Sequence, residues 1–197
     1  VMNILIVGCG TVGSNLAYML ALKSLEGDYI ESIKLIDSDC LEEKNLPYIF
    51  GESFLKSYIG APKVTVLKDI IQSVNPKIEV IDSYRHYSHD CGFIGEWDYK
   101  IDCRDTPDES SFFNLKLNND GKYSLIIVNP KDEKNSKQSR YTMKNSRISS
   151  LILCSECIDI IINRSNQEER ICYVLTTIDG KEEFINVPET KITKINE

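Results

Sequence analysis

The sequence lacks a long apolar run. Its longest candidate, residues 148–162, is interrupted by three serines, a glutamate and an aspartate, and charged side chains are costly in a bilayer core. We therefore expect no membrane span. Residues 1–7 lack a basic flank and a small-residue cleavage site, so we expect no secretory signal and a cytoplasmic protein.

Basic residues are also scarce relative to acidic ones. The chain has 23 Lys and Arg against 30 Asp and Glu, a net charge of −7, which argues against a general duplex DNA binder. The seven cysteines are odd in number and have no framework spacing, so they are expected to be reduced thiols rather than disulfides. With 197 residues, 42% of them hydrophobic, the chain is long enough for one globular domain spanning residues 1–197.

Short apolar segments alternate with segments of helical periodicity along the chain. This order predicts an α/β fold, a doubly wound and mostly parallel Rossmann-like sheet closed by a C-terminal helix and β-hairpin. Strands are expected at residues 3–7, 32–37, 77–81, 99–102 and 124–128, with the hairpin at 171–177 and 183–187. Helices are expected at residues 14–25, 62–74, 109–117 and 146–164, and a basic loop at 131–147.

A glycine signature follows the first predicted strand. Gly8, Gly10 and Gly13 form a G-x-G-x-x-G turn between that strand and a helix, where backbone amides can face a phosphate. Asp37 ends the second predicted strand, 24 residues after Gly13, and can accept hydrogen bonds from a ribose diol. Both features predict a nucleotide site. The alternative is that the glycines only pack the helix on the strand.

Further motifs follow in a set order. They are Asp37-Ser38-Asp39, Asn45-Leu46, Gly60-Ala61-Pro62-Lys63, Asn75-Pro76 and Asp102-Cys103-Arg104-Asp105. This succession resembles the ThiF-type adenylyltransferases of the ubiquitin-activating enzyme superfamily, whose pattern is G-x-G-x-x-G, D-x-D, Asn-Leu, G-x-x-K, Asn-Pro and D-C-x-D. The likeness covers about residues 3–130.

The resemblance implies ATP-dependent adenylation of the C-terminal carboxylate of a small ubiquitin-like protein or peptide, with ATP and Mg²⁺ as cofactors. By position, Asp37 would hold the ribose, while Asp39 and Asn45 would order the phosphate side. Lys63 would neutralise the triphosphate and Asp105 would bind Mg²⁺, which makes these two the expected catalytic residues. The alternatives are a solvated lysine for Lys63 and a helix-start cap for Asp105.

The sequence departs from the family pattern in its cations. The Arg-Gln that follows Asn-Leu-x in the family is replaced by Tyr48-Ile49, so one phosphate-binding arginine is missing. We also expect the arginine-bearing helix before the first strand to be absent, because that strand is predicted to begin at Asn3. Arg104 or the cations of residues 131–147 are candidate substitutes.

The cysteine pair Cys154-x-x-Cys157 offers only half of the ligands of the family's zinc module, and one pair cannot close a tetrahedral site. We therefore expect no zinc and interpret both as small core residues, with a redox or thioester-forming thiol, here or at Cys103, as the alternative. His86 and His89 lack ligand spacing to another cluster, so surface or core polar roles are expected. The basic loop at 131–147 carries six basic and two acidic residues, and either closes over ATP or an acidic tail or is a solvated linker.

Three functions remain open on the sequence. The first is the adenylating enzyme just described, with a protein or peptide tail as partner, an expected homodimer or larger assembly, and no nucleic acid or membrane partner. The second is a catalytically inactive ThiF-like fold that serves as a binding or assembly module, which the missing arginines favour. The third is an NAD-dependent oxidoreductase, which is disfavoured because no substrate domain follows the nucleotide half.

Overall fold

A seven-stranded mixed sheet organises the protein. The computed structural model describes residues 1–49, 55–88, 95–105, 113, 115–119, 124–128, 146–163 and 173–174. The strands, in sheet order, are β3 (Glu79–Tyr84), β2 (Ile30–Asp37), β1 (Met2–Val7), β4 (Tyr99–Asp102), β5 (Leu115–Asn119), β6 (Ser124–Val128) and β7 (Tyr173–Val174). The first five are parallel, whereas β6 pairs antiparallel with both β5 and β7.

The strand order explains where a ligand can bind. From β1 the chain moves outward to β2 and β3, and it then crosses back to continue through β4 and β5 on the other side of β1. This reversal is the doubly wound topology predicted from the sequence, and it places a switch point between β1 and β4. The expected adjacency of the first two strands is also confirmed, since β1 and β2 pair from Asn3 with Ser32 to Val7 with Ile36.

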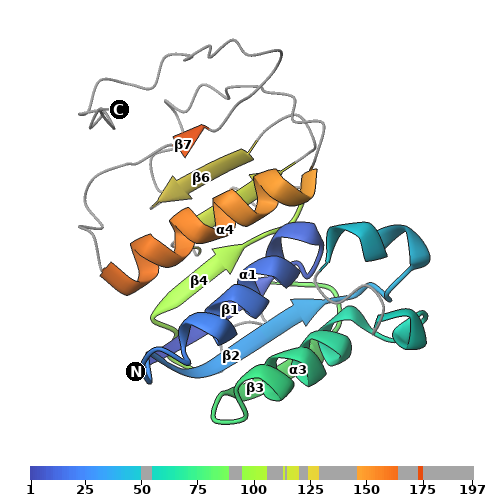
Figure 1. Cartoon of the computed structure of the whole chain (residues 1–197), viewed down its shortest axis with the longest axis horizontal. Helices are drawn as coiled ribbons and strands as arrows, with labels where there is room; N and C mark the ends of the chain where they lie inside the picture. The colour runs from blue at the N-terminus through green and yellow to red at the C-terminus, as the bar shows by residue number, and fades with distance from the viewer. Residues whose placement is uncertain are drawn as a thin grey trace.

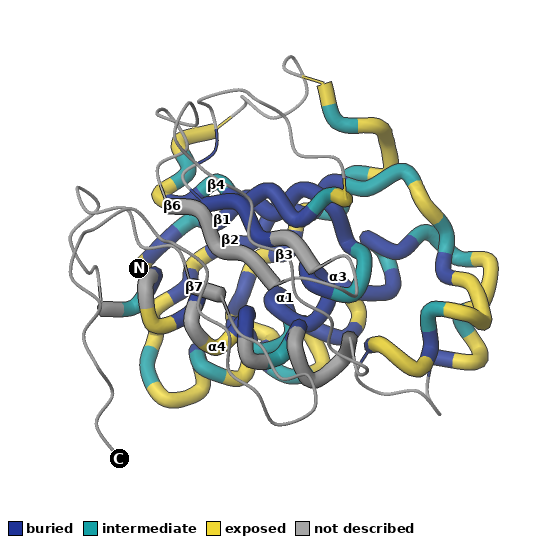
Figure 2. Tube along the Cα trace, turned by 90° about the horizontal axis from the view of Figure 1, so that it is seen from above, coloured by how far each residue is buried: buried dark blue, intermediate teal, exposed yellow. Residues whose placement is uncertain are grey.

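Three helices cover one face of the sheet: α1 (Thr11–Lys23), α3 (Lys63–Val74) and α4 (Ser146–Asn163). Figure 1 shows them side by side, with α1 between the other two. Two short 3-10 helices, η1 (Glu43–Tyr48) and η2 (Lys56–Tyr58), lie in the connection between β2 and α3. Figure 2 shows that burial is most continuous along β1, β2 and α1 in the middle of the molecule.

The central strand β1 is buried on both faces. Ile4, Leu5 and Ile6 are each 0% exposed, as expected for a parallel strand with cover on both sides. Ile4 and Ile6 belong to the main core beneath the helices. Leu5 and Val7 belong to a smaller cluster on the opposite face.

The predicted helix at 109–117 is wrong over its last residues. Residues 115–119 form strand β5, in which Leu115 and Leu117 face the main core while Lys116 between them faces the other side. Their partners decide the outcome, because β5 is paired on one side by β4 and on the other by β6. Tertiary hydrogen bonding has overridden a local helical pattern.

Other boundaries agree with the expectations or shift by a few residues. The third strand begins at Glu79 rather than residue 77 and runs on to Tyr84. The C-terminal helix α4 is confirmed. Of the predicted hairpin, Tyr173–Val174 forms β7 on the edge of β6, whereas residues 183–187 and most of the basic loop, residues 131–145, lie outside the described residues.

Candidate functional site

The candidate site lies at the carboxyl ends of the parallel strands. In a parallel sheet these ends share one edge, and the loops that follow them meet there. This edge receives the glycine turn after β1, residues 37–40 after β2, residues 84–88 after β3 and residues 103–105 after β4. Predicted site residues lie at three of these ends, those of β1, β2 and β4, and are gathered from positions up to about a hundred residues apart.

Two of the three glycines are required by packing. Gly8 has φ +90°, and a Cβ there would lie 2.9 Å from the backbone N of Arg104. A Cβ at Gly13 would lie 1.9 Å from the carbonyl oxygen of Gly8, so only glycine lets α1 come this close to the turn. At these two positions close packing by itself requires a glycine.

Gly10 is different, because a Cβ built there would meet no atom of the described residues within 4 Å. Gly10 is the N-cap of α1 and has no side chain to cap the first amides, and the first turn of this helix contains no acidic residue. The start of α1 is therefore a place where an anion could be bound by backbone amides and by the helix dipole.

Asp37 joins the glycine turn to the loop after β2. Its Oδ2 accepts a hydrogen bond from the backbone N–H of Cys9 at 2.5 Å, and its Oδ1 accepts one from Asp39 at 2.7 Å. The side chain is half-buried. Each carboxylate oxygen has a second lone pair, so the backbone bonds leave capacity for a ribose hydroxyl.

Asp39 and Lys63 form an ion pair with very unequal exposure. Their Nζ and Oδ2 atoms are 2.9 Å apart, but the side chain of Lys63 is only 9% exposed and that of Asp39 is 65% exposed. Lys63 is therefore not the solvated lysine of the alternative interpretation. It is a largely desolvated cation whose present partner faces solvent.

Local backbone pairing holds Lys63 in this place. Cys40 forms an antiparallel bridge with Pro62, Gly60 donates to the carbonyl of Leu41, and the amide of Lys63 donates to the carbonyl of Asp39 at 2.9 Å. Gly60 has φ +90°, a conformation that glycine adopts at no steric cost. The G-x-x-K motif is thus a turn that returns the chain to residues 39–41 and starts α3 beside them.

Asn45 has a local structural partner. Its Oδ1 accepts a hydrogen bond from the backbone N–H of Glu42 at 2.9 Å, as part of the capping box of η1. Among the described residues, no contact links its side chain to Asp37, Asp39 or Lys63. The structure therefore brings together four loops of the predicted site and leaves Asn45 engaged at the start of η1.

Asp105 and Arg104 follow directly on β4. Asp105 is exposed and makes no hydrogen bond or ion pair within the described part of the chain, and the residues needed to judge it as a helix cap lie outside that part. Arg104 is bound by Asp102: its Nε and Nη2 atoms each lie 2.8 Å from one carboxylate oxygen. Its guanidinium also lies 4.7 Å from the centre of the Tyr87 ring.

Sequence reasoning missed a further pair at this edge. The Oγ of Ser38 lies 3.0 Å from Nδ1 of His86, and the amide of Arg85 donates to the carbonyl of Asp37. No local spacing could have shown this contact, because 48 residues separate Ser38 from His86 and only the pairing of β2 with β3 brings them together. His89 lies outside the described residues.

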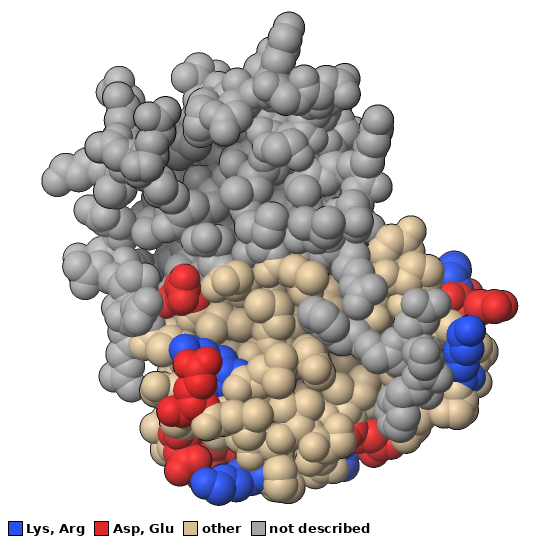
Figure 3. All heavy atoms as spheres, viewed as in Figure 1, with Lys and Arg blue, Asp and Glu red and all other residues tan. Residues whose placement is uncertain are grey.

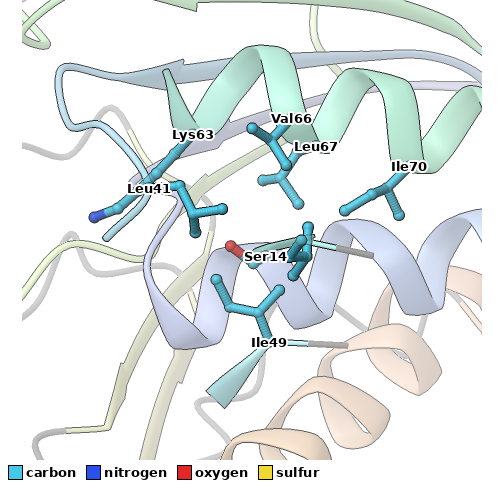
Figure 4. A pocket seen from close by; sticks show the side chains of 8 residues that line it. Ser14, Leu41, Ile49, Lys63, Val66, Leu67 and Ile70 are labelled. Carbon is cyan, nitrogen blue, oxygen red and sulfur yellow. The ribbon is translucent and has the colours of Figure 1, made fainter. Parts of the chain in front are cut away.

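A small cavity beside Lys63 is not a ligand site. It measures about 10 Å³ and is lined by Ser14, Leu41, Ile49, Leu55, Lys63, Val66, Leu67 and Ile70. This is about the limit for one water molecule. Figure 4 shows the apolar side chains converging on it while the Lys63 amine points away, so it is a gap in the core.

The cysteines of the described residues are mostly buried thiols. Cys154 and Cys157 are each 0% exposed, as the core interpretation predicts. Burial raises the pKa of Cys154 to about 12, and it also raises the pKa of Cys103 and Cys157 well above the usual range. Such thiols stay protonated and are poor nucleophiles, which argues against a thioester-forming role for them.

The helix-covered face carries little charge at its centre. Figure 3 shows the charged side chains of the described residues near its borders, with uncharged surface over the helices.

Within the described ranges, no helix combines the length and apolarity needed to cross a bilayer. No group of three or more His, Cys, Asp or Glu side chains in these ranges is arranged to hold a metal ion.

The sheet order, the glycine turn and the acidic end of β2 define a Rossmann-like α/β protein. The model of the ThiF family matches residues 1–121. The chain therefore belongs to the ThiF family. No curated protein is matched.

The chain is similar to solved structures of two E. coli proteins. The tRNA N6-threonylcarbamoyladenosine dehydratase TcdA, solved with AMP, is 28% identical over 53% of this chain and 42% of its own, with a TM-score of 0.46. MccB, solved with ATP, is 18% identical over 88% of this chain and 63% of its own, with a TM-score of 0.63. Another MccB structure contains MccA. This chain thus spans less than two thirds of either protein, and the MccB likeness supports the fold alone.

Proposed function

We propose that the protein adenylates the C-terminal carboxylate of a small ubiquitin-like protein or peptide, with ATP as the adenylyl donor. In this reaction a carboxylate oxygen attacks the α-phosphorus, the bond between that phosphorus and the bridging oxygen breaks, and pyrophosphate leaves. The reaction needs alignment and charge neutralisation more than an acid or a base. Membership of the ThiF family supports the reaction class, and the arrangement at the strand ends supports the site.

The observation that carries the proposal concerns Gly10. Gly8 and Gly13 are explained by packing, but Gly10 is not, since a Cβ there would contact none of the residues that the structure describes. A glycine is useful at this point if phosphate oxygens approach the first amides of α1. We therefore propose that Gly8, Gly10 and Gly13 shape the phosphate cradle, and that Gly10 borders the phosphates.

The charged residues fit a nucleotide laid across this edge. Asp37 would accept hydrogen bonds from the ribose with its spare lone pairs, and Lys63 would neutralise the phosphates after leaving Asp39. Asp105, exposed after β4, is a suitable carboxylate for Mg²⁺. Bound Mg²⁺ would supply charge neutralisation for the triphosphate. Asn45 would act on the phosphate side through the shape of η1.

A nucleotide-binding module without turnover is the second candidate. The observation in its favour is that Tyr48, 40% exposed at the end of η1, occupies the position of the family's arginine. Loss of a charge-stabilising group from the transition state costs on the order of a hundredfold in rate. Such a module would bind ATP and would not exchange pyrophosphate.

The deciding experiment is ATP–pyrophosphate exchange in the presence of ubiquitin-like proteins or peptides with free C-terminal carboxylates. We expect exchange that depends on the added carboxylate and is lost in D105A. The matched control is D28A, which removes an exposed aspartate, paired with Lys77, that precedes β2 at the amino ends of the parallel strands. It is expected to exchange normally.

The cysteine pair provides a second comparison in the same assay. The double variant C154S/C157S is expected to melt at a lower temperature and to retain exchange, because both thiols are buried in the core. ATP binding without exchange would favour the binding module. Tighter binding of NAD than of ATP would contradict both candidates.

A further inference from the structure

Arg104 occupies the variable position of the D-C-x-D motif. Groups of the protein itself already bind its guanidinium. Nε and Nη2 bond the two oxygens of Asp102, and the backbone amide of Arg104 bonds Oδ1 of Asp102 at 3.1 Å. The side chain of Asp102 is 1% exposed and that of Arg104 is 25% exposed. Releasing the guanidinium would leave a buried carboxylate without this partner, which is strongly destabilising.

Two aromatic rings hold the other side of the guanidinium. The centre of the Tyr87 ring is 4.7 Å from Cζ of Arg104, and that of Phe113 is 5.6 Å away. The rings themselves are 5.4 Å apart. Tyr87 follows β3 and Phe113 precedes β5, so one side chain links the segments around three strands.

The same residue lies against the glycine turn. A Cβ at Gly8 would be 2.9 Å from the backbone N of Arg104 and 3.0 Å from its Cγ. The amide of Cys103 bonds the carbonyl of Val7 at 2.7 Å. Any shift of the turn after β4 would therefore disturb the glycine turn and move Asp105, the next residue in the chain.

We propose that Arg104 is a positioning residue that clamps the end of β4 to the glycine turn and thereby fixes Asp105. This inference rests on the proposed function, and it assigns Arg104 a role other than substitute for the missing arginine. The fork geometry is essential to the clamp, because two parallel bonds to Asp102 and stacking on aromatic rings need a planar guanidinium. A lysine would keep the charge and lose both features.

The test compares R104K and R104M with wild type and with K68M. The control variant breaks another half-buried ion pair, between Lys68 and Asp82 at 2.7 Å on α3 and β3. We expect R104K and R104M each to bind Mg²⁺·ATP at least tenfold more weakly in calorimetry, and K68M to bind as wild type does. In hydrogen exchange, the amides of Cys9 and Cys103 are expected to exchange at least tenfold faster in both Arg104 variants and unchanged in K68M.

Retention of wild-type ATP affinity by R104K would overturn the clamp, because charge alone would then suffice. Weaker ATP binding with unchanged hydrogen-exchange rates at Cys9 and Cys103 would also overturn the clamp, since Arg104 would then contact the nucleotide directly. If wild type fails to bind ATP, the proposed function fails. The hydrogen-exchange rates alone then decide whether Arg104 holds the turn after β4 against the glycine turn. Should R104M not fold, R104K carries the test, because it keeps a cation beside Asp102.

Discussion

The glycine turn separates a packing role from a binding role within one motif, and two single-methyl variants test this division. In G13A the new Cβ would lie 1.9 Å from the carbonyl oxygen of Gly8, and real contacts of this kind stay above 3.0 Å. The helix α1 must therefore move away from the turn by about 1.1 Å, since backbone on both sides cannot rotate aside. Such overpacking costs about 3 kcal/mol. For a chain of this size we expect the melting temperature to fall by about 6–12 °C.

In G10A the same methyl group would touch no atom of the described part of the chain. Gly10 has φ −74° and ψ −156°, an extended conformation open to alanine. Alanine is a poorer N-cap than glycine, which lowers the free energy of unfolding, but it also makes the unfolded chain less flexible, which raises it. These two contributions nearly cancel, so the free energy of unfolding should stay within about 0.5 kcal/mol of wild type. The methyl would, however, stand where we propose the phosphates, and ATP binding should weaken at least tenfold, or about 1.4 kcal/mol.

The assays are differential scanning calorimetry for stability and isothermal titration with ATP for affinity, applied to both variants. The predicted result is a reversal: G13A loses stability, whereas G10A keeps its stability and loses ATP affinity. An unchanged melting temperature in G13A would show that α1 is not seated against the Gly8 carbonyl as described. Unchanged ATP affinity in G10A would place the phosphates elsewhere and remove the main support for the proposed site.

Three other predictions concern charges and thiols. D39N should lower the free energy of unfolding by about 1 kcal/mol and K63M by less, because D39N leaves a desolvated cation unpaired while K63M leaves an exposed carboxylate. Chemical denaturation measures both changes, and a larger loss in K63M than in D39N would contradict the ion-pair description. Asp82 has its pKa lowered by the hydrogen bond from Lys68, so the pair stabilises the fold above about pH 4. The stability difference between wild type and K68M, at most about 1 kcal/mol, should therefore shrink as the pH falls further, and a difference that grows in acid would refute this. In native alkylation with peptide mapping, the half-buried Cys40 should react well before the fully buried thiols, and equal rates would be inconsistent with their burial. The slow set is Cys9, Cys103, Cys154 and Cys157.

Local sequence patterns were sufficient to predict the elements that are buried evenly or whose ends are set by nearby residues. The apolar run of β1 is readable because a central parallel strand is buried on both faces, and Pro62 and Asn75 mark the limits of α3 because they act within one turn of the chain. The order of motifs from Gly8 to Asp105 was also enough to indicate the family. These signals are local, so they survive without knowledge of the fold.

Segments that depend on distant partners could not be judged in this way. Leu115–Asn119 has the composition of either a helix or a strand, and pairing with β4 and β6 made it a strand. The motif likewise gave no means of separating Gly10 from Gly8 and Gly13, since the difference lies in which atoms surround each missing Cβ.

The sequence by itself determined the α/β class, the family and the set of candidate residues, because these are recorded in periodicity and in motif order. Only the tertiary structure decided which residues act together. Lys63 is a buried partner of Asp39 because the bridge between Cys40 and Pro62 returns the chain to that point. Arg104 is bound by Asp102 and stacked on Tyr87 because strands distant in sequence end at one edge of the sheet. Charge, burial and contact are properties of that shared edge, and a linear pattern does not contain them.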